Sequence, residues 1–244
     1  MQQFHLLNKT LRSIFTKLTH RACNSPAPQR HGDLCYTKRI MERLTIQVGG
    51  FEVNCSILSE NGKAWIVDPG QEPDRIIDLL AKKGLEPAAI LLTHGHFDHI
   101  SGIPGLLERF PDLPVYVHEK DLPMFGHPLN QLPPEYPSFA KPKEIKCLSS
   151  RVVECLSLEV EVIETPGHTP GGVCYYFPKD KLLLSGDTLF AGSVGRTDLP
   201  GGDMATLMDS LRKLTALPDD TLVIPGHGMH TRIALEKSGN PFLQ

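Results

Sequence analysis

The segment 93–99, with the sequence THGHFDH, constrains this chain more than any other feature. It directly follows a continuous apolar run that begins at Ala88, as expected of a strand buried on both faces. Three later apolar runs also end in turns rich in glycine or proline, and these turns contain His168, Asp187 and His227. Because strand ends can aim side chains from distant sequence positions into one pocket, we expect the four turns to contribute to a single site.

Short β-like runs alternate with turns and a few helices from Met41 onward. The expected strands are 44–48, 53–58, 64–67, 88–93, 115–117, 145–148, 152–156, 158–163, 172–177, 181–184 and 221–224. The expected helices are 73–83, 100–110, 204–215 and 231–237, and the proline-rich stretch 121–143 is expected to be an irregular loop. This alternation favours an α/β (α+β) domain over residues 41–244, in which two packed sheets are covered by helices.

Residues 1–40 differ in charge from the rest of the chain. They contain seven Lys or Arg residues and a single acid, Asp33, whereas the whole chain has a net charge of −3. We interpret this basic extension as disordered, or as lying before a true start at Met41, and we then expect a cytoplasmic protein. The alternative is a transit peptide, which would direct the protein to an organelle matrix.

The composition narrows the range of partners. A net charge of −3 gives no general reason to expect binding to nucleic acid or to an acidic membrane surface. No apolar stretch approaches the roughly 20 residues that a membrane-spanning helix needs. The six cysteines include no C-x-x-C pair, so we expect them to be reduced.

The residue types in the four turns are typical of a metal site. Imidazole and carboxylate ligands suit zinc, iron or manganese better than calcium. In the tight turn His94-Gly95-His96 both rings can reach one ion, while Asp98 and His99 can turn toward a second. Metal coordination lowers the pKa of water to roughly 7, which supplies a nucleophile without any Ser or Cys. The sequence therefore predicts a metal-dependent hydrolase.

Four motifs together resemble those of the metallo-β-lactamase-fold hydrolases: H-x-H-x-D-H at 94–99, T-P-G-H-T at 165–169, G-D-T at 186–188 and P-G-H-G at 225–228. The resemblance implies a four-layer αββα sandwich with a two-metal site at one edge. It implies a first metal held by His94, His96 and His168, a second held by Asp98, His99 and His227, and a bridging Asp187. It also implies that Asp68 supports the site from behind the ligands.

Within that superfamily, the segments G-D-T-L-F at 186–190 and G-R-T-D at 195–198 resemble the glyoxalase II-like (hydroxyacylglutathione hydrolase-like) branch. This resemblance implies hydrolysis of small thioesters of the S-lactoylglutathione type, with Asp98 orienting the attacking hydroxide. The chain ends 17 residues after His227, so we expect a short form without the helical domain that helps to bind glutathione. Arg196 and residues 197–202 are then the nearest candidates for substrate contacts.

Two alternatives remain open. The G-R-T-D segment, with His94, His168 and Asp187, also resembles mononuclear iron persulfide dioxygenases. A non-catalytic scaffold of the same fold is the other alternative, although none of the seven ligand positions is degenerate. We expect two divalent ions, with zinc as the first candidate and iron or manganese open. The acyl group and the oligomeric state are left open.

Overall fold

The computed structural model describes residues 41–126, 130, 142, 145–148 and 158–244. The basic extension over residues 1–40 and the strand expected at 152–156 lie outside this part of the chain. Within it, no helix is both long and apolar enough to cross a membrane.

The first sheet has six strands in the order β1-β2-β3-β4-β5-β6. They are β1 Glu42–Val48, β2 Val53–Glu60, β3 Lys63–Val67, β4 Glu86–Leu91, β5 Val115–Val117 and β6 Ile145–Cys147. The first three strands are antiparallel neighbours, and β3 to β6 pair in parallel. The two-residue turn Asn61-Gly62 joins β2 to β3 with left-handed φ angles of 53° and 78°, as tight hairpins favour.

The second sheet has five strands in the order β13-β12-β9-β8-β7. They are β7 Glu161–Glu164, β8 Val173–Phe177, β9 Leu182–Gly186, β12 Leu222–Pro225 and β13 Thr231–Arg232. Only β12 and β9 pair in parallel in this sheet, as far as the described residues show. A short separate hairpin, β10 Leu189–Phe190 and β11 Ser193–Val194, follows β9 and was not expected from the sequence.

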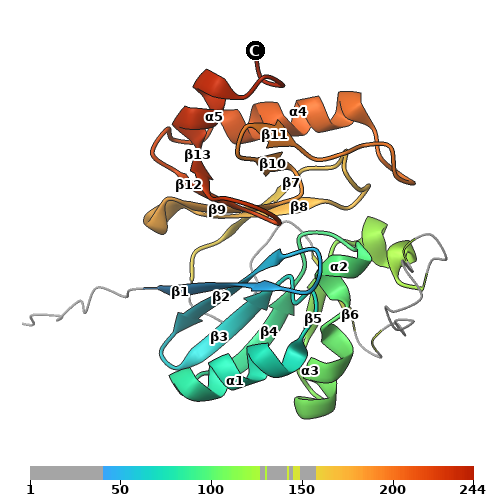
Figure 1. Cartoon of the computed structure of the whole chain (residues 1–244), viewed down its shortest axis with the longest axis vertical. Coiled ribbons are helices and arrows are strands. Elements are labelled where there is room, and N and C mark those ends of the chain that lie inside the picture. The colour runs from blue at the N-terminus through green and yellow to red at the C-terminus, as the bar shows by residue number, and fades with distance from the viewer. Residues whose placement is uncertain (1–40, 127–129, 131–141, 143–144, 149–157) are drawn as a thin grey trace, which may run out of the picture. The chain divides into compact units, whose positions relative to one another are not determined.

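Helices lie on the outer faces of the two sheets, apart from α2 (Phe97–Ile100), which lies at the edge of the sandwich (Figure 1). They are α1 Pro73–Lys83, α2 Phe97–Ile100, α3 Ile103–Arg109, α4 Met204–Thr215 and α5 Ile233–Gly239, with 3-10 turns η1 Glu119–Met124 and η3 Pro178–Asp180. Figure 1 shows α1 and α3 against the first sheet, and α4 and α5 against the second. The expected helix at 73–83 is confirmed, with Pro73 in its first turn and Gly84 directly after its end.

Strand alternation builds three apolar cores. On β9, Leu182 and Leu184 point into the core between the sheets, where they join Trp65 of β3. Leu183 points the opposite way, into the core beneath α4. The third core joins the other face of the first sheet to α1 and α3, with Ile76 among its members. Three cores thus separate four layers, and the predicted αββα sandwich is confirmed.

One predicted helix is split in two. The sequence suggested a continuous helix over 100–110, but the structure has α2 ending at Ile100 and α3 beginning at Ile103. The reason is Pro104, which has no N–H to donate and whose ring would clash with the preceding turn of a continuous helix. Pro104 is tolerated because it lies in the first turn of α3.

Other boundaries also differ from the expectation. Residues 231–232 pair with β12 as β13, so the last helix begins only at Ile233. The strand expected at 158–163 is β7, which begins at Glu161. The stretch 121–143 is not irregular throughout, because its first residues belong to η1. The first two differences lie at the ends of elements, where boundaries are least defined by local preference, and the third is a short 3-10 turn within the expected loop.

Hydrogen bonds join the two sheets beside their strand ends. The side-chain amide of Asn54 in β2 donates to the carbonyl oxygens of Pro225 and Gly228, at 3.0 and 2.9 Å. The buried hydroxyl of Tyr175 in β8 donates to the carbonyl of Leu92, at 2.7 Å. The edge that carries the histidine and aspartate turns is therefore held from both sheets.

Candidate metal centre

Each predicted ligand turn lies just beyond a strand. His94 comes three residues after β4, Asp187 directly follows β9, and His227 comes two residues after β12. His168 lies in the turn between β7 and β8. The segment after His94 runs into α2, which contributes the remaining side chains of the 93–99 motif. The structure thus brings all seven residues to one edge of the sandwich, while their role as ligands stays a prediction.

The first group of ligand atoms belongs to His94, His96 and His168. Their candidate ligand nitrogens lie within 4.8 Å of one another. Nδ1 of His96 lies 2.9 Å from Nε2 of His168. All three residues are buried, with 2%, 8% and 4% of their surface exposed.

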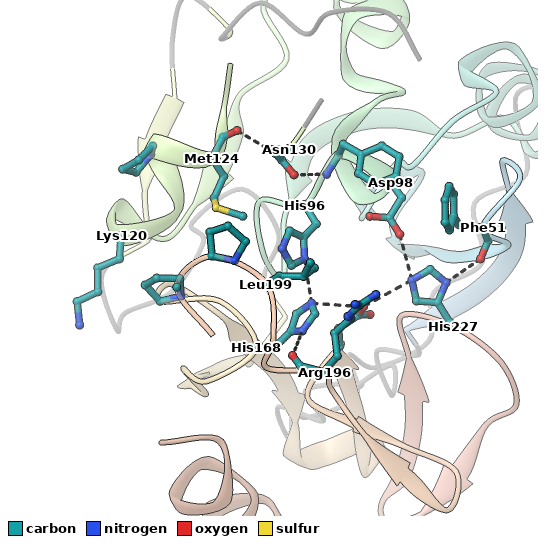
Figure 2. Close-up of a pocket in the computed structure, with 16 residues that line it drawn as sticks. Phe51, His96, Asp98, Lys120, Met124, Asn130, His168, Arg196, Leu199 and His227 are labelled. Atoms are coloured by element: carbon teal, nitrogen blue, oxygen red, sulfur yellow. Dashed lines mark hydrogen bonds and ion pairs between the residues drawn. The ribbon is translucent and has the colours of Figure 1, made fainter. Parts of the chain in front are cut away.

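The second group comprises Asp98, His99 and His227, whose candidate ligand atoms also lie within 4.8 Å of one another. Nε2 of His227 lies 3.2 Å from Nε2 of His99 and 3.2 Å from Oδ2 of Asp98. Figure 2 shows Asp98 and His227 directed toward each other at the edge of the cavity.

Asp187 lies between the two groups. Its Oδ2 is 3.5 Å from Nε2 of His168 and 3.6 Å from Nε2 of His227, and its Oδ1 is 3.4 Å from Nε2 of His99. A β-carbon on Gly226 would collide with Oδ1 of Asp187 and with the His99 ring, so glycine is required there. Asp187 is therefore placed where a bridging ligand would have to lie.

Backbone carbonyl groups fix the orientation of two of these rings. Nδ1 of His168 lies 2.7 Å from the carbonyl oxygen of Arg196, and Nδ1 of His227 lies 2.7 Å from that of Phe51. A carbonyl oxygen only accepts, so Nδ1 carries the proton in both rings. The lone pair is therefore on Nε2, which points into the centre.

Asp68 orients two more rings. Its Oδ2 lies 3.1 Å from Nδ1 of His99 and accepts the Thr93 hydroxyl at 2.7 Å. That hydroxyl lies 3.1 Å from Nδ1 of His94, from which it can accept a hydrogen bond. His94 and His99 thus also present Nε2 to the centre, whereas His96 presents Nδ1. Asp68 occupies the supporting place that the motifs imply.

The electrostatics agree with a cation in the centre. Burial lowers the pKa of His94 well below its ordinary value, and it lowers the pKa of His96 to about 4, so both rings are in the neutral form that binds metals. Burial also lowers the pKa of His99, but the carboxylates of Asp187, Asp98 and Asp68 outweigh it and raise that pKa well above its ordinary value. Three carboxylates around one buried ring are stable only if a positive charge lies among them.

The donor set fits divalent metal ions. Buried Nε2 of His94 has no hydrogen-bond partner among the described residues. Nε2 of His168 faces Nδ1 of His96, and Nε2 of His227 faces Nε2 of His99, while Nδ1 of His168 and of His227 is held by a backbone carbonyl. Neutral imidazole with carboxylate oxygen is the set that zinc, iron and manganese accept. These residues can therefore hold two ions, one in each group.

A cavity of about 460 Å³ opens onto the centre. Its walls are largely apolar, and Figure 2 shows Phe51 beside His227 with Lys120 at a distance from it. The residues that line it outside the two ligand groups and Asp187 are Phe51, Phe97, Lys120, Pro123, Met124, Asn130, Pro170, Arg196, Leu199, Pro200 and Gly201. The loop predicted to meet substrate thus contributes Leu199, Pro200 and Gly201, together with Arg196 before it.

Arg196 combines two contacts. Its guanidinium group forms two hydrogen bonds of 2.7 Å with Asp198, while its carbonyl oxygen holds His168. The side chain lines the cavity but is already paired. A substrate carboxylate would therefore have to compete with Asp198 for this group.

Sequence reasoning missed two buried polar residues beside the centre. The side chain of Asn130 donates to the carbonyl of Gly95 and accepts from the N–H of Phe97, at 2.8 and 2.9 Å. Asp121 accepts from the N–H of Gly95 at 2.9 Å. Both come from the proline-rich stretch, where a single acid or amide forms no pattern that would distinguish it.

Comparisons with known proteins agree with this geometry. The family model of the Metallo-beta-lactamase superfamily matches residues 48–227. The chain is 39% identical over 203 residues to the probable metallo-hydrolase YqgX of Bacillus subtilis, covering 80% of this chain and 94% of that protein. It is 37% identical over 207 residues to the hydroxyacylglutathione hydrolase GloC of Haemophilus influenzae, covering 81% and 96%.

A solved structure shows the same fold with metal bound. The di-iron-bound form of TTHA1623 superimposes with a TM-score of 0.73 at 38% identity, covering 82% of this chain and all of that one. These relatives agree with the glyoxalase II-like resemblance of the motifs. The chain belongs to the metallo-beta-lactamase superfamily, a family of metal-dependent hydrolases.

Proposed function

We propose that this protein is a two-metal thioesterase that hydrolyses S-acylglutathione-type thioesters. The observation that carries the proposal is the pair of ligand groups joined by Asp187 at the base of an open cavity. The relative of the thioesterase class, the hydroxyacylglutathione hydrolase GloC, supports the choice of reaction.

The proposed roles follow the two groups. His94, His96 and His168 would hold the first ion. Asp98, His99 and His227 would hold the second, and Asp187 would serve both. Ions bound there supply a water of lowered pKa and polarise the carbonyl oxygen of the substrate.

Asp98 has a second proposed role. Its carboxylate lines the cavity and is acceptor-only when ionised, and Oδ2 already faces His227 at 3.2 Å. The adjacent imidazoles, His99 first, lower the pKa of this carboxyl below its ordinary value despite its burial. An ionised Asp98 can accept a hydrogen bond from the attacking water and so orient it toward the thioester carbonyl.

The cavity walls suit the two arms of a thioester. Phe51 and Phe97, whose rings meet edge to face at 5.3 Å, form an apolar wall beside the second group. Arg196 and Lys120 contribute the two cationic side chains among the described lining residues. A sulfur-linked molecule that is apolar near the reacting carbon and anionic at its far end fits this distribution.

The test is metal analysis and a substrate panel on one preparation purified without added metal. We expect two ions per chain and hydrolysis of S-lactoylglutathione-type thioesters, measured as free thiol release. One iron per chain, with oxygen uptake on glutathione persulfide and no thiol release, would instead support a persulfide dioxygenase. Bound metal with no turnover on either substrate class would favour the non-catalytic scaffold.

A further inference from the structure

Asp121 is a buried carboxylate that the proposed reaction does not use. It lies in η1, is 0% exposed, and is not among the residues that line the cavity. Burying an ionised carboxyl is costly unless its oxygens are hydrogen-bonded. The partners of this carboxylate therefore indicate what it contributes.

Those partners belong to two different ligand turns. Oδ2 accepts the N–H of Gly95 at 2.9 Å and the hydroxyl of Thr169 at 2.8 Å, while Oδ1 accepts the N–H of Gly171 at 2.6 Å. Gly95 is the residue between His94 and His96, and Thr169 directly follows His168. One side chain thus joins the turn that carries two members of the first group to the turn that carries the third.

The fit between Asp121 and these turns is close. A β-carbon on Gly171 would lie 2.7 Å from Oδ1 of Asp121, so only glycine allows this approach. Three groups, the N–H of Gly95, the hydroxyl of Thr169 and the N–H of Gly171, donate hydrogen bonds to this one carboxylate. An asparagine could accept at one position only and would turn its own N–H groups toward a donor.

We propose that Asp121 is a positioning residue that sets the distance between the His94–His96 turn and His168, and thereby the geometry of the first metal group. The inference rests on the proposed metal centre, but it concerns only one half of it. The hydrogen bonds of Asp121 within the described part of the chain go to Gly95, Thr169 and Gly171 and not to the second group, so we expect the effect to be selective for the first group.

The first measurement needs neither metal nor substrate. Backbone amide exchange is compared in metal-free wild-type protein and in Asp121→Asn, with the exposed α1 residue changed in Asp78→Asn as a matched control. We expect faster exchange at Gly95 and Gly171 in Asp121→Asn alone, because both N–H groups lose an ionised acceptor. Unchanged exchange at both glycines would overturn the proposal.

The second measurement isolates each group. Zinc affinity of the full chain is determined by competition with a chromophoric chelator in two backgrounds, His227→Ala, which leaves the first group complete, and His168→Ala, which leaves the second. Adding Asp121→Asn is expected to weaken zinc binding about tenfold or more in the first background, in the range of outer-sphere changes. In the second background we expect less than about a threefold change, because Asp121 contacts neither His99 nor Asp98.

Equal weakening of zinc binding in both backgrounds would show a general structural role and would overturn the proposal.

If Asp121→Asn does not fold, Thr169→Val removes one donor with little change of shape, and Thr169→Ser restores the hydroxyl. We expect Thr169→Val to weaken zinc binding at the first group roughly threefold or more, because one hydrogen bond is lost. Thr169→Ser should restore the zinc affinity. No difference between the two would contradict the inference. If the zinc affinities change as expected but the wild-type protein has no thioesterase activity, the proposed function is rejected and the role of Asp121 is not.

Discussion

The two halves of the candidate centre use similar donors in different surroundings. In the first group all three histidines are buried, and Asp121 ties their two turns together. In the second group the side chain of His227 is 26% exposed, and its ring is held by the carbonyl of Phe51 in the β1–β2 hairpin. Ligands of both halves line the cavity, but we call the first half closed because its three rings are buried and braced by Asp121, and the second half open because the His227 ring is partly exposed.

The difference separates two requirements of a hydrolytic site. A closed group keeps its ligands in fixed directions because packing leaves them no alternative. An open group lets water and substrate reach the reacting atoms. We infer that the first group maintains the geometry and the second provides the access. Both inferences can be tested by changes that act on one half or on both.

The largest effect is expected at Asp187, the residue that contacts both halves. In Asp187→Asn one anionic oxygen becomes an N–H donor that faces imidazole nitrogens. We expect metal content and thioesterase rate to fall together. The rate should fall by more than about 100-fold, the upper range for changes to residues that only support the ligands. Elemental analysis and thiol-release kinetics on one preparation measure both.

Asp78→Asn on α1 provides the matched control for that loss of charge, since it removes an exposed carboxylate on the far face of the first sheet. It should leave metal content and rate unchanged. Wild-type turnover in Asp187→Asn would mean that the two halves work independently and that Asp187 does not connect them.

A smaller effect is expected at Asp68, which stands behind both halves. Asp68→Asn keeps an acceptor for the N–H of Thr93 but places an N–H donor near His99 or the Thr93 hydroxyl. We expect metal affinity to fall about 10- to 100-fold, as for other partners of metal ligands. Zinc competition in the His227→Ala and His168→Ala backgrounds shows whether the loss reaches the first group through Thr93, or stays with His99.

Short-range signals in the sequence predicted two packed sheets covered by helices and the meeting of the four ligand turns, whereas the four-layer order was implied by the resemblance of the motifs. Apolar runs mark strands, and each run ended in a turn with His or Asp within a few residues, as at Leu184 before Asp187. Strand ends converge in any layered sheet protein. The family model and the four-layer arrangement confirm the fold, while the ligand roles of the seven residues stay a prediction.

The residues that brace and line the site could not be predicted in this way. Asp121 meets Gly95 because η1 lies against the 93–99 turn, and Asn130, beyond η1 in the sequence, meets the same residue. Phe51 reaches His227, 176 residues along the chain, beside an isolated antiparallel bridge between Val53 and His227. Such contacts are set by tertiary packing, and no local pattern records them.

Metal removal tests the difference in access directly. If the second group is the more open, dialysis of the metal-loaded protein against a chelator should release its ion first, in a separate and faster phase. The His227→Ala variant should lack that fast phase, whereas the remaining ion should leave at the slow wild-type rate. Release of both ions in a single phase would show that the exposure of His227 does not control exchange.

The smallest effect is expected at the apolar wall of the open half. Phe51→Ala removes a ring that is 48% exposed and meets Phe97 edge to face. Complete burial of such a side chain contributes about 1.5–3 kcal/mol, so a substrate that covers a ring about half exposed gains about half of that, and we expect KM to rise by roughly 3- to 10-fold. The backbone carbonyl that holds His227 is retained in this variant, so kcat and metal content should change little.

Leu235→Ala on α5 is the matched control, because it truncates a side chain that is 59% exposed and lies outside the cavity. Its KM should equal that of the wild type. If Phe51→Ala instead lowers kcat and metal content with KM unchanged, the hairpin serves to hold His227 rather than to receive substrate. The ligands of the open half would then be held by neighbouring residues, as those of the closed half are. The two halves would differ in the exposure of their ligands but not in how the ligands are supported.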